Sequence, residues 1–477
     1  MKKPYVLTCL CTLVIGCSDG GDSSRNENAW SNNPIVQSQS GPIEALPDVN
    51  DTWSWKAIPY AAPPIGELRW KAPRDPMPWE QPLVSDTFGE QCVQYSQSGS
   101  GLVGSENCLT LNVWRPQSQE QKLPVYVWIH GGGNTSGSAG LSYHEGANLA
   151  ATSNVVFVSM NYRLGPFGWF YNEALLDGGP DTDSGNFGTL DIIKSLQWIR
   201  DNIEAFGGDS DNVFITGESG GGINVLSLLL STPASGLFHK AMSQSGLLAA
   251  TNLEGAARFS NTLLPGVLVE EGVAANEAEA QAMLAQMTAE EVRELLLAAA
   301  PSSLMDPIPK IGVGLLSMPI LYSDGHVIVQ DVSTALEQGT YPNKVPLILG
   351  TNSGDVRLFL FILDAPLSTD MEMYNAVSDI GGILWKAAGA DEFARAMVDI
   401  PGQPDIYIYS FEWGRYATDG SAITPEPFNY LIGAGHSIDI PFFLDTLDRD
   451  NQLAGLLFTE ENRKSRKLLS AEMIRYV

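Results

Sequence analysis

Residues 213–230 read VFITGESGGGINVLSLLL and contain the pattern that decides the fold. A β-branched run at 213–216 enters a Gly-Glu-Ser-Gly-Gly turn, and a helical run at 223–230 leaves it. Strand, sharp turn and helix in this order are typical of a nucleophile elbow, which raises a serine hydroxyl clear of a sheet. The flanking glycines permit the tight turn, and the helix N-terminus favours negative charge. We therefore predict that Ser219 is a nucleophile, with a purely structural glycine-rich turn as the alternative.

Short β-branched runs alternate with helical stretches from about residue 120 onward. Apolar runs of about four to eight residues between turn signals suit central strands of a parallel sheet. The alternation predicts the α/β class, with a mostly parallel, twisted sheet flanked by helices. The expected strands are 125–129, 155–159, 213–216, 345–349 and 406–410, and one expected helix is 189–205.

Residues 274–299 are rich in Ala and Glu at helical spacing and lie between two expected strands. Thr288 and Glu291 form a capping-box pattern, which predicts the start of a second helix within this stretch. We interpret the segment as a helical cap insertion. A plain pair of surface helices is the alternative.

The charge of the chain excludes several classes of partner. The 477 residues include 27 basic and 55 acidic side chains, for a formal net charge of −28. Phosphate contacts need a basic surface, so no nucleic-acid partner is expected, and charge-driven binding to anionic membranes is disfavoured. No CxxC, HExxH or Asp-rich calcium loop occurs, so we expect no metal and no cofactor.

The N-terminus has the organisation of an export signal. Lys2 and Lys3 precede an apolar run at 6–16 that is too short to span a bilayer. The run ends in Val-Ile-Gly before Cys17, which resembles the bacterial lipobox, where cleavage precedes a cysteine that is then lipidated. We predict a lipoprotein signal peptide at 1–16 and a lipid anchor on Cys17. An ordinary cleaved signal is the alternative.

The predicted processing defines the domains and the compartment. Residues 18–42 are almost all Ser, Asp, Asn, Gly, Gln and Pro, so 17–44 is predicted to be a flexible tether and 45–477 the folded domain. We expect the protein in the cell envelope, on the periplasmic side of an outer membrane, or secreted. Its only membrane contact would be the anchor.

Two cysteines remain after the signal is removed and Cys17 is lipidated. An oxidising compartment favours a disulfide between Cys92 and Cys108. Two unpaired buried thiols are the alternative.

A second chemical motif follows the strand 125–129, where residues 130–133 read HGGG. Acyl transfer creates an oxyanion that preorganised backbone N–H groups must meet, and this run after an early strand is the oxyanion motif of lipases and esterases. His130 itself is expected to be a structural loop residue.

These motifs together resemble the type-B carboxylesterases, the carboxylesterase/cholinesterase family of α/β-hydrolases. The resemblance covers roughly residues 55–477. Further runs that carry it are IPYA at 58–61, PPIG at 63–66, SENCL at 105–109, NYRLG at 161–165, FGGD at 206–209 and QSG at 244–246. It implies the α/β-hydrolase fold with helical cap insertions and a serine hydrolase that acts on small carboxylic esters.

The same resemblance assigns several residues. The oxyanion donors fall on the N–H groups of Gly132, Gly133 and Gly220. The family's N-terminal disulfide falls on Cys92 and Cys108. Its buried ion pair falls on two further residues, Arg69 and Glu106, which we expect to be structural.

The general base should be a histidine that follows the nucleophile in the chain. His436 lies in a Gly-Ala-Gly-His-Ser loop after the strand 406–410, where the family's catalytic histidine also falls. A base must be neutral, so activity should rise with pH near the ordinary histidine value of ~6.5.

The orienting acid departs from the family pattern, in which a Glu follows an Asp. Here Asp355 occupies the Glu position and Gly354 replaces the Asp. Aspartate serves this role in other triads, but it is one methylene shorter, so its backbone must come nearer to His436. A solvated loop carboxylate, with a different acid in the triad, is the alternative. By resemblance, Ser245 would support the triad.

Other departures bear on the substrate. Asn134 follows the oxyanion glycines, where many relatives have an aromatic residue, and Gly220 replaces the usual Ala after the nucleophile. The loop 93–107 lacks the Trp of cholinesterases, so cation–π binding of a quaternary ammonium is not supported there.

We expect a carboxylesterase for short-to-medium acyl esters. The alternatives are a lipase for longer chains, with 274–299 as its lid, or a catalytically weak binding or adhesion protein. The chain ends inside a helical pattern that relatives continue, so we also expect a short C-terminus. The sequence does not indicate an oligomeric state.

Overall fold

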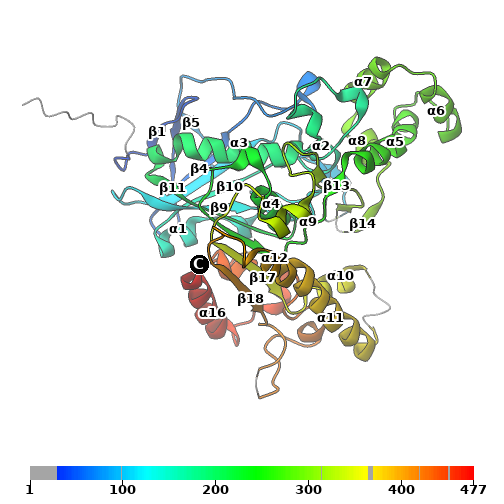
Figure 1. Ribbon diagram of the computed structural model, residues 1–477. Coiled ribbons are helices and arrows are strands. Elements are labelled where there is room, and N and C mark those ends of the chain that lie inside the picture. The colour runs from blue at the N-terminus through cyan, green and yellow to red at the C-terminus, as the bar shows by residue number, and fades with distance from the viewer. Residues whose placement is uncertain (1–29, 98, 313, 364–368, 418, 450–451) are drawn as a thin grey trace, which may run out of the picture.

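A nine-stranded mixed sheet runs through the molecule, and helices cover both of its faces (Figure 1). The computed structural model describes residues 30–97, 99–312, 314–363, 369–417, 419–449 and 452–477. The strand order is β18-β17-β12-β11-β9-β10-β8-β4-β3. The strands from β18 to β10 are parallel, and the other three add antiparallel at one edge. This is the mostly parallel α/β sheet that the sequence predicted.

The sheet contains each of the five expected strands. The parallel strands are β9 (Leu123–Ile129), β10 (Val156–Met160), β11 (Gly208–Glu218), β12 (Lys240–Gln244), β17 (Leu347–Asn352) and β18 (Ile406–Phe411). The antiparallel strands are β3 (Leu46–Asp48), β4 (Thr52–Pro59) and β8 (Thr110–Pro116). The sequence analysis missed β12, because its Lys-Ala-Met-Ser-Gln composition is not typical of a buried strand although four of its five residues are buried.

The prediction that 406–410 forms a central strand was wrong. β18 lies at the edge of the sheet, where Tyr407 is 47% and Ile408 41% exposed. A run of large apolar residues indicates a strand but carries no information about its neighbours.

Side chains of each central strand point alternately to two cores, as a pleated strand requires. In β9, Val125, Val127 and Ile129 pack in the core shared with α3 (Phe187–Asn202) and α4 (Gly220–Leu229). The intervening Tyr126 and Trp128 pack in a second core. The helices on that second side are α1 (Ala147–Ser153) and α14 (Ile440–Phe443), with α16 (Arg463–Tyr476) packed against α14.

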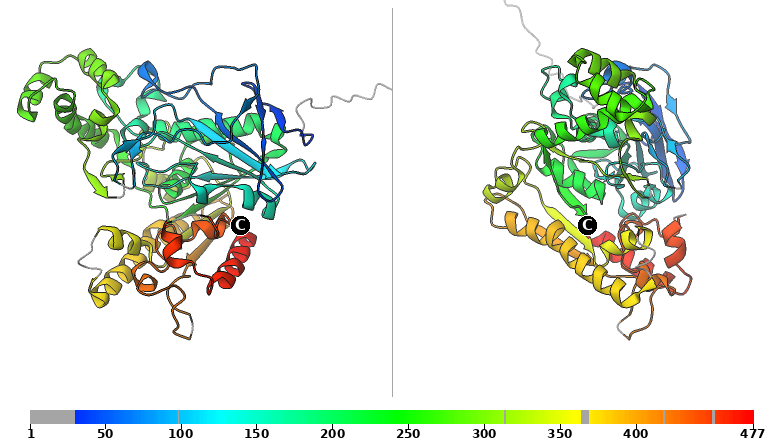
Figure 2. Two further views of the ribbon diagram at one scale, coloured as in Figure 1. Left: turned by 180° about the vertical axis from the view of Figure 1, so that it is seen from behind. Right: turned by 90° about the vertical axis from the view of Figure 1, so that its right-hand side faces the viewer.

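Two groups of helices project beyond the sheet on one side of the molecule (Figures 1 and 2). The upper group in Figure 1 is α5 (Leu253–Glu270), α6 (Glu277–Leu284), α7 (Ala289–Ala298) and α8 (Pro301–Met305). The lower group is α10 (Asp355–Leu363) and α11 (Met371–Lys386), whereas α12 (Glu392–Met397) packs on the main core.

The upper helical group contains the segment interpreted as a cap insertion. Residues 274–299 form α6 and α7, and Thr288 with Glu291 makes the expected capping box. The insertion is held to the body by Arg69, whose guanidinium pairs with both carboxylate oxygens of Glu106 at 2.8 and 2.6 Å. The same side chain donates to the carbonyls of Leu296 and Ala299 at the end of α7.

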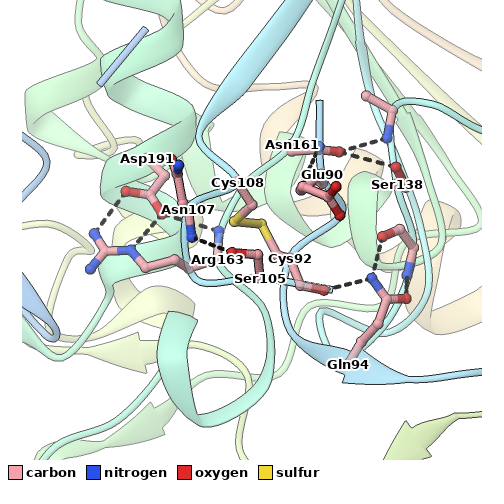
Figure 3. Close-up of a disulfide and its surroundings, with 12 residues drawn as sticks. Glu90, Cys92, Gln94, Ser105, Asn107, Cys108, Ser138, Asn161, Arg163 and Asp191 are labelled. Atoms are coloured by element: carbon pink, nitrogen blue, oxygen red, sulfur yellow. Dashed lines mark hydrogen bonds and ion pairs between the residues drawn. A yellow bond between two sulfur atoms is a disulfide. The ribbon is translucent and has the colours of Figure 1, made fainter. Parts of the chain in front are cut away.

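The disulfide Cys92–Cys108 is present and buried, ahead of β8 (Figure 3). Gln94 connects it to the loop that follows the HGGG run. Its amide donates to the carbonyls of Cys92 and Gly137, at 2.9 and 2.8 Å, and accepts from the Gly137 N–H at 2.8 Å. Asn161 accepts from the Ala139 N–H of the same loop at 2.8 Å.

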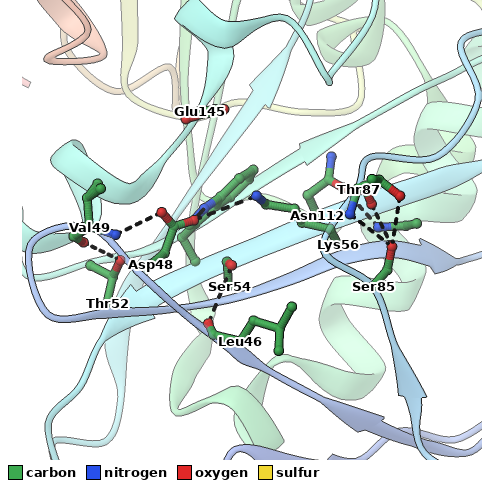
Figure 4. Close-up of polar contacts among 12 residues, drawn as sticks. Leu46, Asp48, Val49, Thr52, Ser54, Lys56, Ser85, Thr87, Asn112 and Glu145 are labelled. Carbon is green, nitrogen blue, oxygen red and sulfur yellow. Dashed lines mark hydrogen bonds and ion pairs between the residues drawn. The ribbon is translucent and has the colours of Figure 1, made fainter. Parts of the chain in front are cut away.

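The antiparallel edge is joined by polar contacts around Asp48 (Figure 4). This carboxylate accepts from the Trp114 indole at 3.1 Å and from the Val49 N–H at 2.8 Å, and Lys56 lies 3.8 Å away. Thr52 closes the turn by donating to the Val49 carbonyl at 2.7 Å. These bonds tie the β3–β4 hairpin to β8.

The predicted tether at 17–44 was wrong for its second half. Residues 30–44 pack on the body and contain β1 (Ile35–Gln37) and β2 (Pro42–Glu44), which pair with each other, and β2 also pairs with β5 (Leu83–Val84). Trp30 is 3% exposed, lies 5.9 Å from the Trp55 ring and 4.1 Å from the Arg115 guanidinium.

The remaining N-terminal predictions lie outside the described residues. These are the signal peptide at 1–16, the lipidated Cys17 and the first part of the tether. Within the described part of the chain, no helix is long and apolar enough to cross a membrane.

We expect Trp30→Ala to lower the free energy of unfolding by about 3–5 kcal/mol, because it removes a buried aromatic ring and leaves a cavity. Urea denaturation of the folded domain measures the change. Met77→Ala is the control, since Met77 is 83% exposed and should shift stability by less than ~0.5 kcal/mol. A Trp30→Ala variant as stable as the parent would show that residues 30–44 are a free tether after all.

Candidate active site

Ser219 lies at a strained turn between β11 and α4. Its φ of 56° and ψ of −118° are unusual for a residue with a side chain, and such strain is typical of functional sites. Two of its neighbours must be glycine. A Cβ on Gly217 would lie 2.5 Å from the Gly221 carbonyl, and one on Gly221 only 2.0 Å from the Ile129 carbonyl.

The HGGG loop passes directly beside this turn. Gly132 and Gly133 have φ of 99° and 58°, a region that favours glycine. The N–H groups of Thr135 and Ser136 both donate to the Gly132 carbonyl at 3.0 Å, which closes the loop. Among the described residues, no acceptor takes the N–H of Gly132 or Gly133.

The third predicted oxyanion donor lies beside these two. Gly220 is the first residue of α4, so its N–H has no acceptor within the helix. A Cβ built on Gly220 would lie 2.9 Å from the Gly133 nitrogen. The structure therefore gathers the predicted donors next to Ser219.

His436 and Asp355 meet at the carboxyl end of the sheet. Asp355 begins α10 just after β17, and His436 lies in a loop after β18. The His436 Nδ1 lies 2.7 Å from Asp355 Oδ1, and both side chains are buried. The other carboxylate oxygen accepts from the Ser245 hydroxyl at 3.1 Å and the Asn352 N–H at 2.9 Å. Asp355 is therefore not a solvated loop carboxylate.

A second carboxylate, which the sequence analysis did not single out, faces the opposite nitrogen of the same imidazole. Glu218 Oε1 lies 3.2 Å from His436 Nε2 and accepts from the Ser437 hydroxyl at 2.8 Å. The Nε2 atom is nevertheless without a hydrogen-bond partner among the described residues. Nε2 is therefore the ring nitrogen that faces the elbow, where Glu218 lies. In the sequence, Glu218 is the first variable residue of the GxSxG pattern, and that pattern assigns it no role.

Asp439 completes a buried acidic group around the histidine. It accepts from the Tyr409 hydroxyl at 2.8 Å and from the Asn352 amide at 3.1 Å. Burial raises the pKa of Glu218 to about 7 and the pKa of Asp439 to about 6. Nothing in the sequence marks Asp439, because its place in the site depends on the loop after β18.

The three carboxylates change the titration of His436. Burial alone lowers the pKa of His436, but the charges of Glu218, Asp355 and Asp439 outweigh it and raise the pKa to about 9. The expected rise of activity near pH 6.5 therefore moves to alkaline pH.

His130 has the structural place that the sequence analysis gave it. Its Nδ1 lies 2.9 Å from the Gly131 carbonyl, and its ring stacks on Tyr162 at 4.4 Å. Burial lowers its pKa to about 4, so it is neutral at physiological pH.

Two aromatic rings stand against the catalytic candidate His436. Phe359 of α10 and Trp385 of α11 stack at 5.7 Å, and their rings lie 4.9 and 5.2 Å from the imidazole. Trp385 is fixed by its indole N–H, which donates to the Ser245 carbonyl at 3.2 Å. Sequence reasoning missed both, since aromatic residues at helical spacing are more often core.

The described residues contain no group of three or more His, Cys, Asp or Glu that could hold a metal ion. The arrangement of a serine on an elbow, a histidine held by a carboxylate, and free backbone N–H groups suits nucleophilic acyl transfer.

Comparison with known proteins agrees with this chemistry. The sequence profile described as "Carboxylesterase family" matches residues 33–380. The chain belongs to the carboxylesterase family. Para-nitrobenzyl esterase of Bacillus subtilis (strain 168) is 31% identical over 463 residues, which cover 90% of this chain and 86% of that protein. Fumonisin B1 esterase of Sphingopyxis macrogoltabida is 34% identical over 343 residues, 71% of this chain and 59% of that protein.

Solved structures agree as well. A structure of PNB esterase has a TM-score of 0.71 and 29% identity, and the match covers 94% of this chain and 90% of that one. The predicted α/β-hydrolase fold is thus confirmed, and this carboxylesterase-family chain is a carboxylic ester hydrolase.

We expect Glu218→Gln to lower the pKa of His436, because it removes the negative charge nearest to Nε2 and so destabilises the imidazolium. NMR titration of labelled histidine measures this pKa in parent and variant. Glu67→Gln is the control, since Glu67 is exposed and pairs with Arg293 instead. An unchanged His436 pKa in Glu218→Gln would contradict the assigned cause.

Proposed function

We propose that this ester hydrolase acts through a Ser219–His436–Asp355 triad and a covalent acyl-enzyme. The observation that carries the proposal is the buried pair of His436 Nδ1 and Asp355 Oδ1 at 2.7 Å, with Nε2 left unpartnered beside the elbow. In this mechanism Asp355 fixes the tautomer that leaves Nε2 as the base, and it stabilises the imidazolium that forms.

The first half of the reaction forms the acyl-enzyme. His436 Nε2 takes the proton of the Ser219 hydroxyl as its oxygen attacks the ester carbonyl. The free N–H groups of Gly132, Gly133 and Gly220 meet the oxyanion, and one such donor is typically worth ~10²–10³ in rate. His436 then gives the proton to the leaving alcohol.

The second half returns the enzyme to its starting state. Water attacks the acyl carbon, its proton passes to His436, and the carboxylic acid leaves as Ser219 regains its proton. Glu218 lies at the Nε2 side of the imidazole, opposite Asp355. The charges of Glu218 and Asp439 both stabilise the charged form of the imidazole. Their charge supports the imidazolium in both halves but delays its deprotonation to alkaline pH.

We further propose short-to-medium acyl esters as the substrates. Phe359 and Trp385 offer an apolar wall beside His436, which suits an uncharged acyl or alcohol group. The negative charge of Glu218, Asp355 and Asp439 disfavours an anionic group near the scissile bond. The names of the two relatives above, para-nitrobenzyl esterase and fumonisin B1 esterase, are consistent with an ester substrate.

We expect the purified folded domain to hydrolyse p-nitrophenyl acetate, and Ser219→Ala to lower kcat by about 10³-fold or more, because no other nucleophile replaces the hydroxyl. Release of p-nitrophenol at pH 9 gives the rates. Ser235→Ala, at an exposed serine, should leave kcat unchanged. Equal activity of Ser219→Ala and parent would contradict the triad, and an inactive folded parent would favour a binding or adhesion protein. Faster turnover of p-nitrophenyl esters with long acyl chains than of the acetate would favour a lipase.

The cellular location is a separate proposal. We propose that Cys17 is lipidated after removal of residues 1–16 and that it anchors the enzyme in the cell envelope. The signal organisation of residues 1–17 supports this, and residues 18–29 would then separate the anchor from Trp30, the first residue of the folded part described here.

We expect labelled palmitate to be incorporated into the full chain in a bacterial host and to be lost in Cys17→Ala, because the thiol is the acceptor. Membrane fractionation and gel fluorography measure the two effects together. Cys11→Ala is the control, since Cys11 lies within the signal. Equal labelling of Cys17→Ala would contradict the anchor.

A further inference from the structure

Two buried asparagines join the oxyanion loop to the helix that follows the nucleophile. Asn134 is the residue after Gly133, and Asn224 lies in α4, five positions after Ser219. Each amide donates to the other: Asn134 Nδ2 to Asn224 Oδ1 at 3.1 Å, and Asn224 Nδ2 to Asn134 Oδ1 at 2.9 Å. Both side chains are fully buried.

Further bonds make Asn134 the fixed point of its loop. Its carbonyl accepts from the Gly165 N–H at 2.7 Å, and its amide oxygen also accepts from the Tyr162 hydroxyl at 3.3 Å. Its φ of 57° lies in the left-handed region, which asparagine tolerates better than most residues with a side chain. Asparagine therefore suits the backbone conformation that the loop has at this position.

The amide pair connects the two halves of the proposed oxyanion hole. The Gly133 N–H lies on the loop side and the Gly220 N–H on the α4 side, and Asn134 and Asn224 connect these two elements. The remaining space is narrow. A Cβ on Gly220 would lie 2.8 Å from the Asn134 nitrogen and 2.9 Å from the Gly133 nitrogen, too close for either backbone atom.

We infer that Asn134 and Asn224 are positioning residues that hold the oxyanion donors at a fixed separation. At that separation, glycine is the only residue type that fits at position 220. The inference rests on the proposed triad mechanism. Donors stabilise an oxyanion only when they are held in place before the reaction, because moving them during it costs the energy they supply. Asn134, Asn224 and Gly220 thus act together: the amide pair holds the loop close to α4, and this close approach requires that residue 220 has no Cβ.

The first test removes the pair. Asn134→Ala and Asn224→Ala should each lower kcat for p-nitrophenyl acetate by ~10–100-fold, since a misplaced catalytic group can cost about 10²-fold. The KM should change by less than about threefold, because the oxyanion exists only in the transition state. The double variant should be no slower than the slower single variant, since either change breaks the same contact.

The matched control is Asn343→Ala. Asn343 is also buried, and its amide donates to the carbonyls of Leu228 and Ser231 at 2.8 and 2.7 Å, away from the oxyanion loop. We call the Asn134–Asn224 amide pair the clamp. Asn343→Ala should lower the melting temperature as Asn134→Ala and Asn224→Ala do, but it should leave kcat within about twofold of the parent.

The second test uses Gly220→Ala. In the parent it should lower kcat by ~10–100-fold, because the methyl group must push the loop away. In the Asn224→Ala background it should cost less than about threefold, since the loop is then free to move. Affinity for a phenylboronic acid, which forms a tetrahedral adduct on serine, should fall in step with kcat/KM across the series.

The outcomes separate the two hypotheses. Activity that does not need Ser219 would refute the triad mechanism, and the clamp with it. Activity that needs Ser219 but is unchanged in Asn134→Ala and Asn224→Ala would refute only the clamp. If Asn343→Ala lost as much kcat as the clamp variants, the fall in kcat would be explained by lower stability, and the inference would be overturned. A Gly220→Ala penalty of the same size in both backgrounds would also overturn the inference.

Discussion

The close approach of the elbow to the end of β9 is the contact on which the rest of the site depends. Gly217 stands opposite Ile129 in the β11–β9 register, and a Cβ on Gly221 would lie 2.0 Å from the Ile129 carbonyl. The oxyanion loop is the direct continuation of β9, and α4 is the continuation of the elbow. Parallel strands in register therefore bring the proposed nucleophile and the proposed oxyanion donors to one level.

The proposed acid and base need more of the chain, because they follow two other strands. β17 and β18 pair in parallel, and a further bridge joins Gly354 to Gly435 beyond their ends. This bridge brings Asp355 and His436 to the same edge as Ser219, where Glu218 already lies. The buried carboxylates then surround one imidazole. Their mutual repulsion is offset by the hydroxyl, amide and backbone donors they accept from and by the positive charge the imidazole carries.

The sequence predicted the parts of this candidate site whose pattern is local. The elbow, the HGGG run and the histidine loop each combine a short motif with a strand or loop, so a pattern is enough to find them. Glu218, Asp439 and Asn224 were missed because their roles arise only when separate segments meet. The same holds for the segment from Trp30 to Glu44: its polar composition favours a tether, yet Trp30, Val36 and Ile43 are buried on the body. Composition averages over a segment, whereas a few apolar contacts decide whether it folds.

Two departures from the family pattern, Asp355 in place of a glutamate and Gly354 in place of an aspartate, compensate for each other. Asp355 lacks a methylene that a glutamate would supply, so the loop carrying it must lie nearer to the loop carrying His436. The Gly354 N–H donates to the Ala434 carbonyl at 3.0 Å, which fixes that proximity two residues before the histidine. A Cβ on Gly354 would lie 3.0 Å from the same carbonyl and 2.7 Å from the buried Arg357 side chain, so a larger residue would separate the two loops. The absence of a side chain at Gly354 therefore compensates for the missing length at Asp355, and the imidazole is met at 2.7 Å by a carboxylate with a shorter reach.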